Sequence, residues 1–351
     1  MSERTQNSEL DAELNSVTSV QFAQAADAVV PALRWSANSQ VEHSAWRKTF
    51  ARRLKALVGK LPKRVPLEVR WDEVLDLGTV MRHKIYVRSE THYWVPAYYF
   101  IPKSAVAETP AIICLHGHSG IVPYIREGDA ATLQKSRELD LDYAVYMAEH
   151  GYITLAGVQR GWNETTFAED QANGIRSCHR GTMSALLLGM TPVGLRCWDA
   201  SRLFDFLKTQ QLVDQTRIGV AGLSGGGTTA LFFAALDERV GLAMIGGFYC
   251  TFRDSIFSSR HCMCNCVPNI MRWGEMREVA ALFAPRPMLI ISGTRDPMFP
   301  IAATRRAYHE LAEVYGLLEA PDKLERDFFD GPHAWNHRKT VPFLRRHWGG
   351  L

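Results

Sequence analysis

The sequence predicts an α/β protein in which a mostly parallel central sheet is flanked by helices. From residue 111 onward, apolar runs of strand length alternate with segments of helical periodicity, which is typical of a parallel sheet covered on both faces. The run at 111–115 is apolar throughout, as in a strand buried on both sides. A glycine-rich turn then joins a second such run to an apolar helix. The strands of this region are expected at 111–115, 152–156, 218–221, 242–245, 288–292 and, at the edge, 324–329.

The connecting helices are expected at 141–150, 193–207 and 300–315, with a closing helix at 341–348. Ahead of the alternating region, three consecutive strands rich in Val, Tyr and Trp are expected at 67–77, 79–89 and 93–101. We therefore assign residues 67–351 to one domain. Its loops around 158–190 and 248–277 are expected to form a cap and the walls of a pocket.

Residues 1–66 are predicted to form a helical extension packed on that domain. Residues 1–15 are polar and acidic and are expected to be disordered. Helical spacing of apolar residues then runs through 17–33 and 42–61, with a basic, solvated face on the second helix. These helices could equally join two copies of the chain into a homo-oligomer.

Composition and charge argue against several classes of protein. The net charge is only +3 and the basic residues are scattered, so neither nucleic acid nor a membrane surface is an expected partner. No apolar segment approaches the length of a membrane span, and the N-terminus lacks the pattern of a signal peptide. Seven cysteines, an odd number, indicate reduced thiols. The expected location is the cytoplasm.

Ser224 stands in the turn between the run at 218–221 and the next helix, within the pattern Gly222-Leu-Ser-Gly-Gly226. This context is typical of a nucleophile elbow, a strained turn whose neighbouring positions must lack Cβ atoms. The amide of Gly225 is expected to point toward an oxyanion formed at the serine. A dinucleotide or phosphate loop is disfavoured, because the G-x-G-x-x-G spacing is absent and no Lys follows.

A nucleophilic serine needs a general base and an acid that orients the base. Asp296 comes just after the strand at 288–292, and His333 lies in a Gly-Pro loop after the strand at 324–329. We therefore predict a catalytic triad of Ser224, Asp296 and His333.

Three other residues compete for these roles. Asp327 is expected inside the edge strand, and Asp330 is expected to cap a turn. His337, the rival base, belongs to the start of a helix and is interpreted as structural. The loop position of Asp296 favours it over both rival acids.

The segment His116–Gly120 follows the strand at 111–115, where a second oxyanion donor is expected. We predict that the backbone amide of His118 pairs with that of Gly225 on the oxyanion. The side chains of His116 and His118 are expected only to fill space and to hydrogen-bond the loop.

A substrate pocket is expected where the loops after the strands meet. Aromatic side chains and one histidine suit the wall of an apolar acyl or alcohol pocket. The residues predicted to line it are Trp162, Tyr249, Phe252, His261 and Trp273.

The segment His261–Cys266 contains three cysteines at alternate positions and suggests zinc. Structural zinc sites, however, favour two or more residues between paired cysteines and need a second ligand pair, which the sequence does not display. We therefore expect Cys262, Cys264 and Cys266 to be reduced thiols that line or support the pocket, and no metal to be bound.

Residues 67–351 resemble the α/β-hydrolase superfamily, and within it the dienelactone-hydrolase-like and acetyl xylan esterase-like branch of bacterial hydrolases. The motifs that carry the resemblance are Leu115–Gly120, Arg217–Gly227, Cys264-Asn265, Ala284–Met288, Gly293–Pro300 and Gly331–His333. Dienelactone hydrolases proper use a cysteine nucleophile, so Ser224 makes an esterase the better match than a lactone-opening enzyme.

The resemblance implies an α/β-hydrolase fold with an N-terminal helical extension. It also implies a serine esterase that cleaves small carboxylic esters, with short acyl groups such as acetyl, through an acyl-enzyme and without cofactor or metal. A lactone hydrolase and a serine peptidase or amidase of the prolyl-oligopeptidase type stay open as alternatives, although the chain lacks the length for a propeller domain. A catalytically inactive scaffold is disfavoured because all three triad residues are present.

Overall fold

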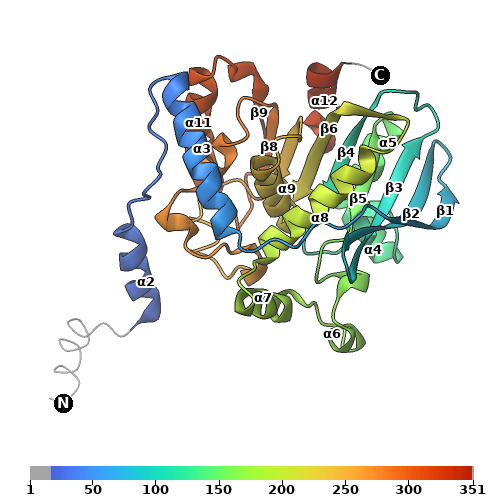
Figure 1. Ribbon diagram of the computed structural model, residues 1–351, viewed down its shortest axis with the longest axis horizontal. Helices are drawn as coiled ribbons and strands as arrows, with labels where there is room; N and C mark the ends of the chain where they lie inside the picture. Colours follow the sequence, from blue (N-terminus) through green and yellow to red (C-terminus); the bar gives the residue numbers. More distant parts are fainter. Residues whose placement is uncertain (1–16, 350–351) are drawn as a thin grey trace.

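Residues 17–349 are described by the computed structural model, and they contain a nine-stranded sheet with helices on both faces (Figure 1). The strand order is β1-β2-β3-β5-β4-β6-β7-β8-β9. The pairs from β1 to β5 are antiparallel, and every pair from β5 through β4 to β9 is parallel. The predicted α/β class and mostly parallel sheet are therefore confirmed. The disorder predicted for residues 1–15 lies outside the described residues.

Each strand expected from the sequence is present. Their bounds are β1 (Val69–Asp76), β2 (Val80–Glu90), β3 (Tyr93–Pro102), β4 (Thr109–Leu115), β5 (Ile153–Gly157), β6 (Val213–Leu223), β7 (Ala243–Gly246), β8 (Met288–Gly293) and β9 (Leu324–Phe329). The strand before Ser224 is longer than predicted, and β9 is the edge strand as predicted.

The expected helices are also present, and four further ones lie in the connecting segments. Their bounds are α2 (Thr18–Asp27), α3 (Gln40–Leu57), α4 (Ala130–Glu138), α5 (Tyr143–Glu149), α6 (Ala168–Ala172), α7 (Cys178–Leu187), α8 (Pro192–Leu207), α9 (Gly225–Leu236), α10 (Met276–Ala281), α11 (Ile301–Leu317) and α12 (Thr340–Trp348). Sequence periodicity did not predict α4, α6, α7 or α10, which are short. Among the described helices, none combines the length and apolar character needed to cross a bilayer.

The first helix is shorter than its apolar pattern predicted. We expected it to extend to residue 33, but α2 ends at Asp27. Pro31 explains the difference, because a proline ring clashes with the carbonyl four residues before it and lacks the N–H of the helical ladder. The carbonyl in that position belongs to Asp27.

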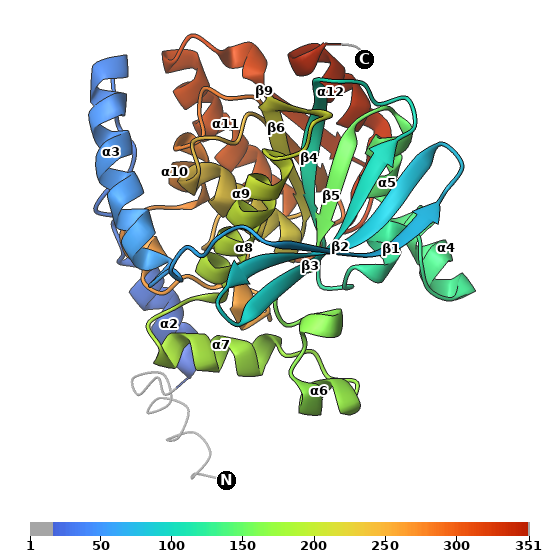
Figure 2. The same ribbon diagram turned by 45° about the vertical axis from the view of Figure 1, so that its right-hand side comes forward.

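The two faces of the sheet are covered by different helices (Figure 2). Alternate residues of β4 divide between the faces: Ile113 packs with α8, α9, α10 and α11, whereas Ile112 packs with α5 and α12. This alternation follows from the two-residue period of a strand. Both faces are buried, which is why β4 reads as a continuous apolar run.

The N-terminal extension is fastened to the sheet domain mainly through α3. Phe50 and Leu54 of α3 are fully buried in the core on the α9 side. The amide of Trp35 donates to Glu278 of α10 at 2.9 Å, and Arg47 Nε donates to the carbonyl of Leu282 at 3.0 Å. In contrast, α2 has no buried residue and lies outside the body of the molecule (Figure 1). Association of two copies through these helices stays a prediction.

Candidate active site

Ser224 lies in the sharp turn between β6 and α9 with φ +58° and ψ −118°. A positive φ is rare for a non-glycine residue and is a source of local strain. The glycines around it leave no room for side chains: a Cβ atom at Gly222 would lie 2.1 Å from the carbonyl oxygen of Gly226, and one at Gly226 would lie 1.8 Å from that of Leu115. The steric reason given for the glycines from the sequence therefore holds in the structure.

Asp296 and His333 are joined by a hydrogen bond of 2.6 Å between Asp296 Oδ2 and His333 Nδ1. The second carboxylate oxygen, Oδ1, accepts from the amides of Met298 at 2.9 Å and Phe299 at 3.2 Å. Only 1 % of the Asp296 side chain is exposed, so its acceptor sites are used by these three donors. The loop after β8 thus holds the carboxylate in one orientation against the imidazole.

The other imidazole nitrogen of His333, Nε2, is buried and has no hydrogen-bond partner within residues 17–349. His333 and Ser224 line the same cleft, which has a volume of about 490 Å³. The side chain of Phe299 stacks on the His333 ring with centroids 5.8 Å apart. The imidazole therefore keeps one unpaired nitrogen, in a residue that lines the same cleft as Ser224.

The rival residues have other partners. Asp330 is 80 % exposed and pairs with Arg295 at 3.2 Å, and Asp327 is buried in β9 and pairs with Arg338. His337 stacks on Tyr146 and bonds Asp142 at 3.0 Å, on the side of the sheet packed by α5. Among these candidates, Asp296 is the acid that contacts His333.

His118 and Gly225 lie next to each other at the carboxyl ends of β4 and β6. A Cβ atom at Gly225 would lie 2.9 Å from Cε1 and 3.0 Å from Nδ1 of His118. Within residues 17–349, neither the His118 amide nor the Gly225 amide has a hydrogen-bond acceptor. The neighbouring amide of Gly117, in contrast, is bound to the Tyr124 hydroxyl at 2.9 Å. Two free donors therefore flank Ser224.

His116, which we expected only to fill space and bond the loop, connects β4 to the segment after β5. Its Nδ1 lies 2.8 Å from the carbonyl of Gly117, and its Nε2 accepts from the amide of Gln159 at 2.9 Å. The amide donor at Nε2 assigns the proton to Nδ1. Full burial lowers the pKa of His116 to about 3, so the ring is neutral near pH 7. The ring fixes the start of the loop that carries His118.

Of the five residues predicted to line the pocket, the structure brings only His261 into the cleft beside Ser224. Trp162 is buried behind the cleft, in edge contact with the rings of His116 and His118. Tyr249 is fully buried and donates to the carbonyl of Ala307 at 2.8 Å. Both face the core because large apolar rings near a strand end are buried by the helices that pack there.

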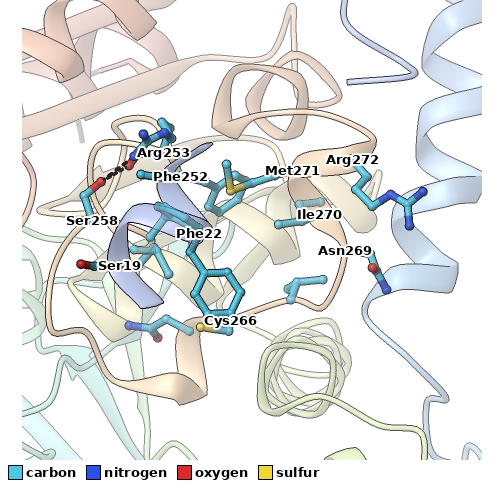
Figure 3. A pocket seen from close by; sticks show the side chains of 15 residues that line it. Ser19, Phe22, Phe252, Arg253, Ser258, Cys266, Asn269, Ile270, Met271 and Arg272 are labelled. Atoms are coloured by element: carbon cyan, nitrogen blue, oxygen red, sulfur yellow. Dashed lines mark hydrogen bonds between the residues drawn. The ribbon is translucent and has the colours of Figure 1, made fainter. Parts of the chain in front are cut away.

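The remaining two predicted pocket residues lie against the N-terminal helices, Trp273 beside α3 and Phe252 beside α2. Trp273 is packed under Arg53, whose guanidinium lies 3.5 Å from the ring centroid. Phe252 lines a separate cavity of about 700 Å³ between α2 and the segment 252–272 (Figure 3). Phe22 of α2 projects into this cavity from the opposite wall (Figure 3). The segment around Cys264 separates the two spaces, since Cys262 lines the cleft and Cys266 lines the second cavity.

Three exposed cations line the cleft and were not identified from the sequence: Lys135, Arg176 and Arg260. Arg176 donates to the carbonyl of His118 at 2.6 Å and so braces the same loop. These residues lie in long connections without a motif, so no sequence signal distinguished them from solvated surface residues. Their presence makes the mouth of the cleft positively charged.

The argument against a metal rested on a missing second pair of ligands, and the structure supplies two further ligand residues. Four side chains bring one potential ligand atom each to the same place, all within 4.8 Å of one another: His118, Cys178, Cys262 and Cys264. His118 and Cys178 are remote from the cysteine segment in sequence, so no spacing pattern contained them. The absence of a second ligand pair, on which we based the expectation of a metal-free thiol cluster, therefore does not hold in the structure.

Together, the sheet order, the strained Ser224 turn and the placement of Asp296 and His333 after β8 and β9 define an α/β hydrolase. The sequence model of the Abhydrolase family matches residues 27–342, and the chain belongs to this family. A proposed hydrolase of Bacillus subtilis (strain 168), YtaP, is 26% identical over 284 residues, which cover 77% of this chain and 88% of YtaP.

Solved structures share the fold at low sequence identity. A proposed acetyl xylan esterase from Bacteroides fragilis superposes with a TM-score of 0.81 at 16% identity, covering 95% of each chain. A glucuronoyl esterase from Solibacter usitatus superposes with a TM-score of 0.68 at 17% identity, covering 87% of this chain and 94% of its own. An acetyl xylan esterase from Paenibacillus sp. R4 gives 0.60 at 19% identity, covering 91% and 98%.

Proposed function

We propose that the protein is a serine esterase that cleaves carboxylic esters through an acyl-enzyme, with Ser224 as nucleophile, His333 as general base and Asp296 as the acid that orients it. The observation that carries the proposal is the Asp296–His333 hydrogen bond of 2.6 Å, which leaves His333 Nε2 unpaired in a residue that lines the same cleft as Ser224. A base with one bonded and one free nitrogen can remove a proton from the serine hydroxyl.

The reaction then follows from these positions. As Ser224 Oγ attacks the ester carbonyl carbon, its proton passes to His333 Nε2, and Asp296 stabilises the imidazolium. The carbonyl oxygen becomes an oxyanion that accepts hydrogen bonds from the amides of His118 and Gly225. The alcohol leaves with the proton from His333. Water then attacks the acyl-enzyme by the same sequence of proton transfers and releases the acid.

Short acyl groups are the proposed substrates because the cleft is small and its mouth is polar. His261, Arg176 and Arg260 line it, and the aromatic side chains predicted to form an apolar acyl or alcohol pocket lie elsewhere. The solved relatives named above include acetyl xylan esterases and a glucuronoyl esterase, so acetylated xylan and glucuronoyl esters belong in the substrate screen.

The test is hydrolysis of p-nitrophenyl esters with acyl chains of two to about twelve carbons, with Ser224→Ala as the matched control. We expect the highest kcat/KM for acetate and a steady decline with chain length, because each added methylene must be accommodated in a cleft of only about 490 Å³. A preference for long chains would overturn the short-acyl assignment. Hydrolysis of p-nitroanilides or lactones, with no ester hydrolysis, would instead identify a peptidase or a lactone hydrolase.

A further inference from the structure

We propose that His118, Cys178, Cys262 and Cys264 bind one Zn²⁺ ion in a closed, structural site directly behind the oxyanion-binding loop. The side chains come from three separate parts of the chain: the loop after β4, the first residue of α7, and the segment around the short helix η3 (Met263–Asn265). Three cysteines and one histidine form one of the standard ligand sets of structural zinc sites.

The spacing of the ligand atoms fits a tetrahedral ion. Cys264 Sγ lies 3.1 Å from Cys262 Sγ and 3.4 Å from His118 Nε2, and all four atoms lie within 4.8 Å of one another. Zn–S bonds of about 2.3 Å and Zn–N bonds of about 2.0 Å place tetrahedral ligands about 3.5–3.8 Å apart. The observed separations lie on both sides of these values, so side-chain adjustments of up to about 1 Å complete the tetrahedron.

The donor atoms select the metal. Thiolates are soft ligands and favour Zn²⁺ over Mg²⁺, Ca²⁺ or Mn²⁺, which prefer oxygen, and a tetrahedral S₃N set suits an ion with no geometric preference of its own. Because protein atoms supply all four ligands, no position is left for water or substrate. The site is therefore structural rather than catalytic.

A buried arginine supports the assignment independently of the ligands. Arg196 of α8 is only 3 % exposed, and its Nε and Nη1 atoms have no hydrogen-bond partner in the part of the chain that the structure describes. It forms no ion pair with a carboxylate there. Its guanidinium lies 4.3 Å from the ring centroid of Trp162, which packs against Cys178 and Cys264.

A buried cation without a carboxylate is costly unless another negative charge offsets it. Three thiolates, one neutral imidazole and one Zn²⁺ carry a net charge of −1. Arg196 is placed to balance that charge, whereas three neutral thiols would leave it uncompensated. The site is buried on the side of Trp162 and Cys264, which are 1 % and 0 % exposed, whereas His118 and Cys262 are half-buried and border the cleft.

The position of the site gives it a role in the proposed reaction. The ring of His118 approaches the backbone of Gly225, and its amide is one of the two proposed oxyanion donors. An ion that joins His118 to Cys178 and to the segment at Cys264 holds that amide in place while leaving the chemistry to the triad. The role of the ion in positioning the His118 amide rests on the proposed esterase function, whereas the proposal that the metal binds does not depend on that function.

The direct test is metal analysis of protein produced in zinc-supplemented medium without a histidine tag. We expect stoichiometric zinc in the wild type and in Cys266→Ser, because Cys266 is exposed and lies outside the cluster, and strongly reduced zinc in Cys178→Ser and Cys264→Ser. Ser224→Ala should keep its zinc while losing activity, which separates the metal site from the proposed function. Equal zinc loss in Cys266→Ser would contradict the ligand assignment.

Replacement of the metal in the wild-type protein covers the case in which the cysteine variants fail to fold. Cobalt(II) in the site should give the intense d–d bands of a tetrahedral ion and thiolate-to-cobalt charge-transfer absorption in the near ultraviolet. Metal removal should lower the melting temperature, since structural zinc contributes to folding free energy. Wild-type protein that folds with no metal, and whose Cys262 and Cys264 are free thiols or a disulfide by mass spectrometry, would overturn the proposal.

Discussion

His333 Nδ1 lies 2.6 Å from Asp296 Oδ2, although the two residues are 37 positions apart and follow different strands. Adjacent parallel strands β8 and β9 bring their carboxyl ends to the same edge of the sheet, which places the two loops side by side. Ser224 reaches the same cleft from the end of β6. Several consequences of this geometry can be measured.

Replacement of Ser224 by Ala should abolish ester hydrolysis without loss of fold. Alanine fits the turn but has no oxygen to attack the carbonyl carbon. Loss of a triad nucleophile should lower kcat on the order of 10⁴-fold or more, measured with p-nitrophenyl acetate. A variant within about tenfold of wild type, a barrier change of about 1.4 kcal/mol, would refute the assignment of the nucleophile.

Asp296→Asn should impair hydrolysis far more than Asp330→Asn. At Asp296 the amide keeps the shape but favours the wrong imidazole tautomer, so kcat should fall by roughly 10⁴-fold. Asp330 is 80 % exposed and its pairing with Arg295 is solvated, so its loss should leave both rate and stability nearly unchanged. If Asp330→Asn were the damaging change, the acid would be misassigned.

Gly226→Ala should destabilise the protein strongly, whereas Gly316→Ala should not. A Cβ at Gly226 would lie 1.8 Å from the carbonyl oxygen of Leu115. Because that oxygen belongs to the backbone of β4, it cannot shift without disturbing the sheet, and we expect the unfolding free energy to fall by more than about 3 kcal/mol. A Cβ at Gly316, inside α11, would meet no atom within 4 Å, and alanine should stabilise the helix by about 0.5–1 kcal/mol. Denaturant titrations of both variants measure the contrast, and equal stabilities would contradict it.

His116 should make folding stability depend on pH below neutrality. Burial lowers its pKa from 6.5 to about 3 in the folded protein, so between these values the unfolded chain binds the proton and the folded chain does not. Its contribution is therefore fully present above pH 6.5 and is lost progressively as the pH falls toward 3, at about 1 kcal/mol per pH unit.

The check is the unfolding free energy of wild type and His116→Gln between pH 7 and 4. Glutamine can still accept from the Gln159 amide but does not titrate, so the difference in stability between wild type and variant should shrink as the pH falls. Parallel pH profiles for the two proteins would show that His116 is not the titrating group.

The order of the elements and the chemistry of the triad candidates could be predicted from the sequence. The strand at 218–221, the glycines beside Ser224 and the loop positions of Asp296 and His333 are local signals, because strand burial, turn geometry and strand-end loops depend mainly on neighbouring residues. The end of α2 was mispredicted although its cause, Pro31, is also local. The apolar spacing of Val29, Val30 and Leu33 continues past Asp27, so periodicity alone extends the helix too far.

The walls of the cleft and the cysteine cluster depended on tertiary structure. Trp162, Tyr249, Phe252 and Trp273 are aromatic residues of suitable loops, yet burial against α2, α3 and the core draws them away from Ser224. Which face a loop side chain takes is decided by the elements packed against it, and no periodicity records that choice.

The four residues proposed as zinc ligands show most clearly the difference between features set by local sequence and features set by tertiary packing. That Cys262 and Cys264 lie near each other follows from the sequence, since one residue separates them. It could not reveal that His118, from the end of β4, and Cys178, from α7, lie beside them, because contacts between distant segments arise only when the sheet and its helices pack together. The residue types at each site could be predicted from the sequence, whereas contacts between remote side chains depend on how the sheet and helices pack together.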